Sequence, residues 1–173
     1  MRMQSHGIEM KRSVYQLDVV DRPFGEVADL LHSRPNELID PEDLVELRDR
    51  NRAVVELDAH LSPFCISCQA LVEFGPFTQI DGQMSVATLR VRWEALEHRS
   101  WFPTWSGEFE AVPRADHTTQ LGFVGTYQPP MGPVGGLADA VILHRVADGA
   151  LRTFFENALI QLAGRVDVQS DHV

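Results

Sequence analysis

Hydrophobic residues follow two different spacings along this chain, and each spacing predicts its own kind of element. Residues 13–20 are rich in β-branched and aromatic side chains, which favours a strand, and residues 24–33 have the amphipathic spacing of a short helix. Between residues 53 and 127 hydrophobic and polar residues alternate, which is typical of consecutive antiparallel strands. We expect five such strands, at residues 53–60, 64–74, 84–96, 104–112 and 117–127.

Helical spacing returns in the last part of the chain. From residue 134 to residue 163 hydrophobic residues recur every three or four positions and form the stripe of one long helix. The segment before it, residues 127–136, reads YQPPMGPVGG; its prolines cannot donate to a strand ladder and its glycines permit a tight turn. We therefore expect the last strand to end in a sharp corner that folds the helix back onto the sheet.

Three shorter segments are predicted to lie outside the sheet. Residues 40–51 open with the helix-start signal DPED and continue as a weak helix or a charged loop. Residues 75–83 and 113–116 are rich in glycine, proline and polar side chains, so they are predicted to be turns between strands.

The order of these elements predicts the fold class. Strands and helices are separated along the chain, which favours an α+β fold with a curved antiparallel sheet around the long C-terminal helix. One face of the sheet should be apolar and the other charged, because Leu89, Val91 and Trp93 alternate with Arg90 and Arg92.

Length and charge limit the possible functions. A chain of 173 residues fits one domain, which we place at residues 13–163, between a disordered lead-in at 1–12 and a polar tail at 164–173. With 25 acidic and 15 basic residues the net charge is -10, which would repel nucleic acid. No apolar run approaches the roughly 20 residues of a membrane span and no export signal is present, so we expect a cytoplasmic location without stable membrane insertion. The oligomeric state stays open.

Three segments of the chain resemble a known superfamily. They read RWEALEHRSWFPTWSGEFEAV, TTQLGFVGTYQPPMGPVGGLAD and HRVADGALRTFFENALIQL, and together they resemble uncharacterised, polyketide cyclase/dehydratase-like members of the SRPBCC superfamily, also called START-like or helix-grip proteins. The resemblance implies a bent antiparallel sheet that grips the C-terminal helix and leaves an elongated cavity between them. It also implies a hydrophobic ligand, since members carry lipids, sterols or hormones and some act on polyketide-like substrates.

Aromatic residues are concentrated in the last three predicted strands. They either line a pocket, where their large apolar area and few polar atoms would bind and orient a ligand, or fill the space under the helix as core. With the resemblance, we expect an apolar small molecule to be the partner and no cofactor to be needed. The predicted ligand-binding residues are Trp93, Trp105, Phe109, Phe123, Tyr127, His144 and Phe155.

His144 and Asp148 carry the alternative, a polyketide cyclase/dehydratase-like enzyme. They are four residues apart on the predicted helix and share the sector of its apolar stripe, so both should project toward the sheet. In the enzyme, Asp148 orients the His144 imidazole, which acts as acid and base. Otherwise the pair satisfies itself, or meets solvent where the stripe drifts around Gly149.

The spacing of Cys65 and Cys68, CISC, is shared by redox dithiols and by half of a zinc site. Within an alternating strand, however, residues three apart point to opposite faces, and no second cysteine pair exists to complete four zinc ligands. We therefore expect no metal, with one thiol in the core and one pointing outward. Glu108 and Glu110 likewise point outward and belong to a solvated face.

Overall fold

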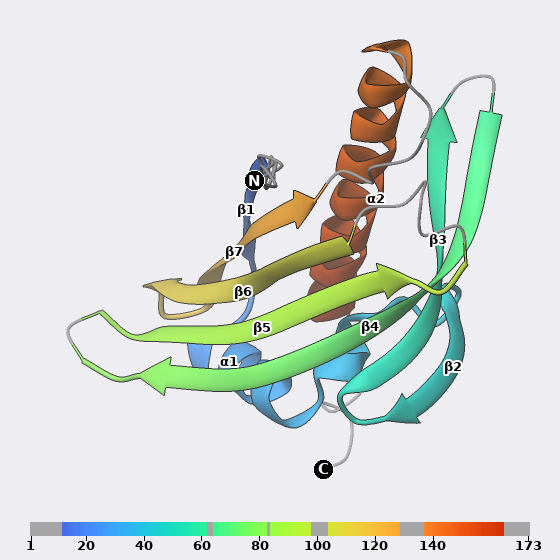
Figure 1. Cartoon of the computed structure of the whole chain (residues 1–173). Helices are drawn as coiled ribbons and strands as arrows, with labels where there is room; N and C mark the ends of the chain where they lie inside the picture. Colours follow the sequence, from blue (N-terminus) through green and yellow to red (C-terminus); the bar gives the residue numbers. More distant parts are fainter. Residues whose placement is uncertain (1–11, 62–63, 83, 98–103, 129–136, 165–173) are drawn as a thin grey trace, which may run out of the picture.

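The computed structural model describes residues 12–61, 64–82, 84–97, 104–128 and 137–164. It has the predicted α+β architecture, a curved sheet with helices on one face (Figure 1). In chain order the elements are β1 (Arg12–Val20), α1 (Phe24–Ser33), the 3-10 helix η1 (Pro35–Leu38), β2 (Leu44–Asp49), β3 (Arg52–Leu61), β4 (Phe64–Ile80), β5 (Val86–Ala95), β6 (Thr104–Ala115), β7 (Thr118–Gln128) and α2 (Leu137–Ala163).

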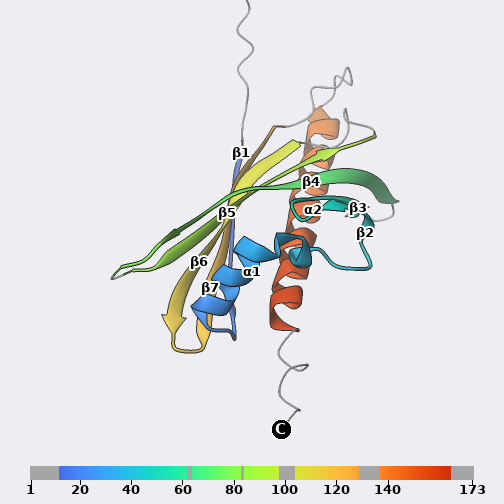
Figure 2. The same ribbon diagram turned by 90° about the horizontal axis from the view of Figure 1, so that it is seen from below.

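The seven strands form one antiparallel sheet in the order β1-β7-β6-β5-β4-β3-β2. The first strand of the chain pairs with the last, so β1 and β2 form the two edges. Figure 2 shows α1 and α2 on the same side of the sheet, whose strands curve past α2. The face toward these helices is therefore the concave one.

The two faces of the sheet differ as the alternation predicts. On β5 the side chains of Leu89, Val91 and Trp93 are buried, whereas Arg90 and Arg92 are exposed. Because side chains of a strand alternate between faces, this strand presents one apolar face to the core. The apolar face packs against the buried side of α2, which consists of Ala147, Ala150, Leu151, Phe154, Phe155, Ala158 and Leu162.

The prediction for residues 40–51 is wrong, because this segment contains the strand β2. β2 pairs antiparallel with β3, and the turn between them is stabilised by a hydrogen bond of 2.8 Å from the Asn51 amide to the Asp49 carboxylate. A helix in this segment would need an apolar face to pack against the core, and the segment offers only a weak one. As a strand, it is stabilised instead by backbone hydrogen bonds to β3. All six side chains of β2 are exposed.

Two predicted turns are in fact parts of strands. β4 continues through Gly75 and Pro76 to Ile80, with a register shift between Phe74 and Phe77 that accommodates the extra residues. β6 continues to Ala115 past a second irregularity. Bulges allow a strand to tolerate proline, because the residue there is left out of the ladder.

Several expectations concern residues outside the described ranges. The corner is described only as far as Gln128, and residues 129–136 are not described, nor are residues 1–11 and 165–173. The predicted long helix is present and begins at Leu137. Neither α1 nor α2, the α-helices of the described ranges, combines the length and apolar character needed to cross a bilayer.

Candidate functional site

Five aromatic rings on three neighbouring strands face α2. In the register of the sheet, Trp93 on β5 is opposite Trp105 on β6, and Trp105 is opposite Tyr127 on β7. Phe109 on β6 and Phe123 on β7 form a second cross-strand pair. Because every second residue of a strand points to the same face, the alternating pattern of these strands gathers the rings on the concave face.

Two phenylalanines of α2 complete this group. The ring centroid of Phe154 lies 4.9 Å from that of Trp93 and 6.1 Å from that of Phe109, and Phe155 stacks on Phe109 at 6.4 Å. Each of the seven side chains is at most 6% exposed. We call them the aromatic cluster: Trp93, Trp105, Phe109, Phe123, Tyr127, Phe154 and Phe155.

The aromatic cluster contains all of the predicted ligand-binding residues except His144. Their positions on the concave face follow from the sequence, since the strand period and the helical stripe both point there. Phe154 was not among the predicted ligand-binding residues, although its place in the helical stripe could have identified it. The rings are in mutual contact, so the described cluster is densely packed.

Phe123 lies directly over the backbone of two glycines. A Cβ atom on Gly107 would be 2.8 Å from the Phe123 ring and 2.5 Å from the Val124 carbonyl oxygen. A Cβ atom on Gly125 would also be 2.8 Å from this ring. The two glycines, which are paired across β6 and β7, therefore make room for the Phe123 ring to approach the sheet.

A pocket of about 130 Å³ lies beside the aromatic cluster, between η1, β3 and α2. We call it the α2 pocket. Its apolar lining residues are Leu38, Ile39, Val55, Leu57, Ala150 and Phe154, and its polar ones are Asp40, Asp43, Glu56, Asp58, Thr153 and Asn157. Phe154 belongs to both groups, so its ring separates the α2 pocket from Trp93 and Phe109.

The polar wall of the α2 pocket is acidic. The side-chain amide of Asn157 on α2 donates a hydrogen bond of 2.8 Å to the carboxylate of Asp43. Burial raises the pKa of Asp43 above its ordinary value, this hydrogen bond lowers it, and the negative charges of Asp40 and Asp58 raise it further, with a net rise. Among the described residues, no lysine, arginine or histidine lines the pocket, so a ligand there meets hydrogen-bond acceptors and negative charge.

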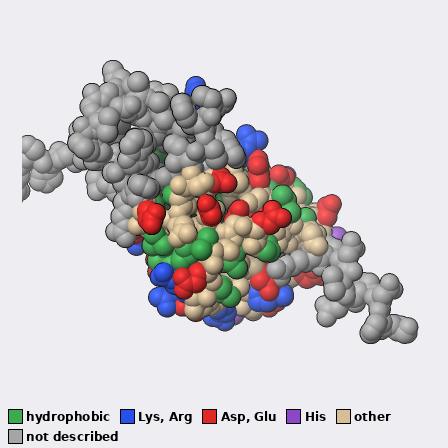
Figure 3. Space-filling model, turned by 90° about the vertical axis from the view of Figure 1, so that its right-hand side faces the viewer, with side chains coloured by type: hydrophobic (Ala, Val, Ile, Leu, Met, Phe, Trp, Pro, Cys, Tyr) green, Lys and Arg blue, Asp and Glu red, His purple; other side chains and the backbone are tan. Residues whose placement is uncertain are grey.

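Sequence analysis did not predict the α2 pocket. Asp40 and Asp43 belong to the DPED motif, which was interpreted only as a helix start. Asn157 gives no signal by itself, because its partner lies 114 residues away along the chain. Figure 3 views the molecule from the side on which β2 and β3 lie in Figure 1, and acidic side chains lie there among hydrophobic ones.

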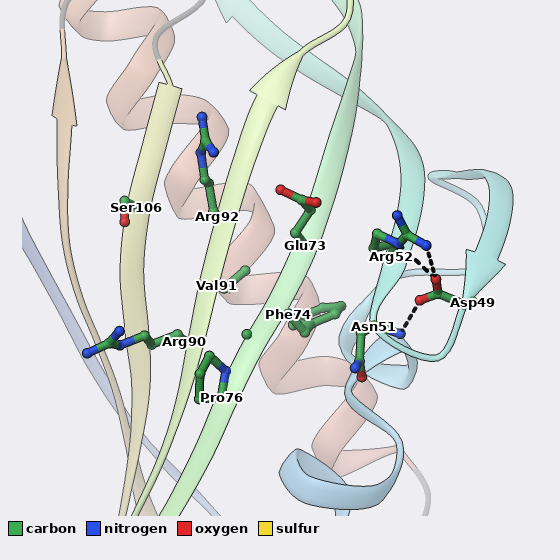
Figure 4. A pocket seen from close by; sticks show the side chains of 11 residues that line it. Asp49, Asn51, Arg52, Glu73, Phe74, Pro76, Arg90, Val91, Arg92 and Ser106 are labelled. Atoms are coloured by element: carbon green, nitrogen blue, oxygen red, sulfur yellow. Dashed lines mark hydrogen bonds and ion pairs between the residues drawn. The ribbon is translucent and has the colours of Figure 1, made fainter.

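A second pocket, of about 490 Å³, lies on the other face of the sheet, at the bulge of β4. Figure 4 shows the polar side chains of Glu73, Arg90 and Arg92 on the side of the strands away from α2, which lies behind them. Arg52 is bonded to Asp49 at 2.7 Å, and hydrogen bonds from Arg52 lower the pKa of Asp49. Arg92 is likewise paired with Glu94 at 3.1 Å. These charges neutralise one another in an open, solvated groove, so we assign it no function.

The prediction that Asp148 projects toward the sheet is wrong. Asp148 is exposed, as is the next residue, Gly149, and it lines an open groove of about 500 Å³ between β1 and α2. The buried side of α2 is centred near Leu151 and Phe154, which leaves Asp148 at its margin, where the sheet ends at β1. This matches the alternative in which the stripe meets solvent near Gly149. The side chain of His144 is not described, and a catalytic role for the pair stays a prediction.

The Cys68 thiol is buried, as predicted for one of the two cysteines. Burial raises its pKa to about 12, and the charges of Asp58 and Glu56 add to this, so the thiol is protonated and unreactive at neutral pH. The side chain of Cys65 is not described. Among the described residues, no group of three or more histidine, cysteine, aspartate or glutamate side chains is arranged to bind a metal ion.

Comparison with known proteins gives similarity in structure rather than in sequence. No protein-family model and no curated protein matches the sequence. Norcoclaurine synthase from Thalictrum flavum, solved in complex with dopamine and hydroxybenzaldehyde, is similar with a TM-score of 0.54 and 10% identity, over 98% of each chain. The ZhuI aromatase/cyclase from Streptomyces sp. R1128 has a TM-score of 0.53 and 18% identity, over 95% of this chain and all of the other.

These similarities establish the fold. Both structures are START-like, and the present chain has the same curved antiparallel sheet and C-terminal helix over nearly its whole length. The chain therefore has the START-like helix-grip fold. At such low identity the similarity shows the fold and no activity.

Proposed function

We propose that this protein binds a hydrophobic small molecule, lipid-like or polyketide-like, between the concave face of its sheet and α2. The observation that carries the proposal is the position of Phe154, whose ring forms one wall of the α2 pocket and also contacts Trp93 and Phe109 within the aromatic cluster. Norcoclaurine synthase, which has the same fold, was solved with two aromatic molecules bound, and this supports the proposal.

The α2 pocket is too small for a whole ligand, so the Phe154 side chain would have to move when the ligand binds. Ligand sites usually measure about 300–1,000 Å³, whereas this pocket measures about 130 Å³, so it accommodates one end of a ligand. The rest of the molecule would occupy space that Phe154 now fills. A rotation of this ring would open the α2 pocket toward the predicted ligand-binding residues, Trp93, Trp105, Phe109, Phe123, Tyr127, His144 and Phe155.

The acidic lining of the α2 pocket determines which polar groups a ligand can place there. Of the four acidic residues in the lining, Asp43 has its carboxylate hydrogen-bonded to Asn157 in the pocket wall, and no basic residue is among the described lining residues, so a hydroxyl or amine would find a hydrogen-bond acceptor while a carboxylate or sulfonate would be repelled. The ligand is therefore a neutral or cationic amphiphile with an aromatic or aliphatic body.

Two fluorescent probes test this proposal. The neutral amine 1-aminoanthracene should bind with micromolar affinity or tighter and change the fluorescence of Trp93 and Trp105, whereas an anionic anilinonaphthalene sulfonate should bind at least about tenfold more weakly. Native mass spectrometry of gently purified protein should in addition show an apolar adduct.

Variants of the pocket wall locate the site. Phe154→Ala should strengthen the binding of 1-aminoanthracene by about fivefold or more because it enlarges the pocket, and Ala150→Leu should weaken it by a similar factor because it fills the pocket. Ile160→Ala, on the exposed side of α2, is the control and should change nothing. Absence of probe binding and of any adduct, or unchanged affinity in both pocket variants, contradicts the proposal.

A further inference from the structure

The two edges of the sheet differ in how well they are protected against pairing with another strand. β2 is six residues long, has two register irregularities with β3 and carries three charges, at Glu46, Arg48 and Asp49. Short, bulged and charged edge strands resist further pairing. β1 is nine residues long and pairs with β7 without any irregularity. It has the properties of a strand that can accept a partner.

β1 also presents an apolar stripe to solvent on the face away from α2. Tyr15 is 61% exposed, Leu17 46% and Val19 49%, and these alternate residues share one face of the strand. Val124 on β7, the register partner of Tyr15, is exposed beside them. Large apolar side chains that are gathered in this way on an edge strand mark an interaction surface.

The backbone of the same three residues points to the free edge. The Val19 amide donates a hydrogen bond of 2.7 Å to the carboxylate of the preceding residue, Asp18. The Gln16 carbonyl, by contrast, lies toward β7, 3.7 Å from where a Cβ atom on Gly122 would be. Since backbone groups of a strand alternate in direction, Tyr15, Leu17 and Val19 direct their amides and carbonyls outward.

We propose that β1 pairs antiparallel with β1 of a second copy of this chain, about a two-fold axis at Leu17. In this register Leu17 faces Leu17 of the second copy and Tyr15 faces Val19 of the second copy, so all three outward-directed residues form hydrogen-bonded pairs. The stripe is complementary to itself, because the large Tyr15 ring lies opposite the smaller Val19 on both sides of the axis.

Charge complementarity on the opposite face favours a second copy as the occupant. In the same register Asp18 of the second copy lies opposite Gln16, which lines the groove between β1 and α2. Arg145, Arg152 and Asp148 line this groove, and Arg152 is already paired with Glu156 at 2.7 Å. The Asp18 carboxylate, which now bonds to the Val19 amide, can therefore turn to the side-chain amide of Gln16 and to the guanidinium of Arg145, and it leaves the Val19 backbone amide free to pair.

The mass of the protein in solution tests the proposal. Sedimentation velocity over a range of concentrations should show a concentration-dependent dimer of the wild-type chain. Leu17→Glu places two carboxylates at the two-fold axis, so this variant should be monomeric with an unchanged thermal midpoint, because Leu17 is already about half exposed. Ile80→Glu introduces the same charge at an apolar site that is 64% exposed on β4 and should leave the dimer intact.

A disulfide tests the register directly. Hydrogen-bonded antiparallel pairs have Cα atoms about 5.5 Å apart, within the range for a disulfide, so Leu17→Cys should form a covalent dimer under mild oxidation. Ile80→Cys and the wild-type chain are the controls and should not. A wild-type chain that is monomeric at its highest soluble concentration, or a dimer that persists in Leu17→Glu or is lost in Leu47→Glu on β2, overturns the proposal.

Discussion

Asn157, near the end of α2, donates a hydrogen bond of 2.8 Å to Asp43, which lies just before β2 and 114 residues earlier in the chain. This contact connects the segment between η1 and β2 to the C-terminal helix. It forms part of the wall of the α2 pocket, and Asp43 is only partly buried there.

Removing the donor should loosen this connection. Asn157→Ala leaves the Asp43 carboxylate partly buried without its hydrogen bond, so we expect the free energy of unfolding to fall by about 1 kcal/mol at pH 7. Urea denaturation monitored by tryptophan fluorescence measures this change. The control is Arg152→Ala, which removes a solvent-exposed ion pair with Glu156 on the same helix and should change the free energy of unfolding less than Asn157→Ala does, because water and salt screen an exposed pair. Equal effects of the two variants would contradict a special role for Asn157.

The pKa of Asp43 predicts how stability depends on pH. Because burial raises this pKa in the folded state above the unfolded value of 3.8, the folded protein binds the proton more tightly, and ionised Asp43 destabilises the fold at neutral pH. Asp43→Asn should therefore raise the thermal midpoint at pH 7. The gain in the free energy of unfolding should be smaller than the loss of about 1 kcal/mol expected for Asn157→Ala, because Asp43 is partly solvated. It should decrease as the pH falls toward 3.8, where Asp43 becomes protonated in the unfolded state as well. A variant that is less stable than wild type at pH 7 would show that the ionised form is favoured by the fold.

Two glycines should respond oppositely to alanine. At Gly107 an added methyl group meets the Val124 carbonyl oxygen at 2.5 Å and the Phe123 ring at 2.8 Å, so Gly107→Ala should destabilise the protein by about 2–3 kcal/mol through overpacking. At Gly149, in α2, nothing lies within 4 Å of the added atom, and Gly149→Ala should stabilise the protein by up to about 1 kcal/mol through helix propensity. Thermal or urea unfolding of the two variants separates these effects, and similar values for both would contradict the packing around Phe123.

The Cys68 thiol should be inert in the folded protein. Since its pKa is raised to about 12 from an ordinary value of 9.0, a Cys65→Ser variant should react with a disulfide reagent at pH 8 only after unfolding. The sign of the shift also predicts that stability contributed by the neutral thiol is complete below pH 9 and is lost progressively between pH 9 and pH 12. Rapid labelling of the folded variant at pH 8 would show that the thiol is accessible and ionised.

The sequence by itself determined the α+β class, the long C-terminal helix and the concave position of the aromatic residues. These features are local: a period of two places Trp93 and Trp105 on one face, and a period near 3.6 aligns Leu151 with Phe155. The apolar or charged character of the side chains on each face already indicated which face is buried.

Only the tertiary structure decided the features that depend on partners far apart in the chain. Residues 44–49 form a strand because β3 lies beside them, and β4 runs through Gly75 and Pro76 because β5 tolerates a bulge there. Asp148 is exposed because the sheet ends at β1, and the α2 pocket is lined by Asn157 and Asp43, which the fold brings together from positions 114 residues apart. Short-range periodicity fixes the direction of a side chain relative to its own element. What that side chain meets depends on packing between elements, which local spacing does not encode.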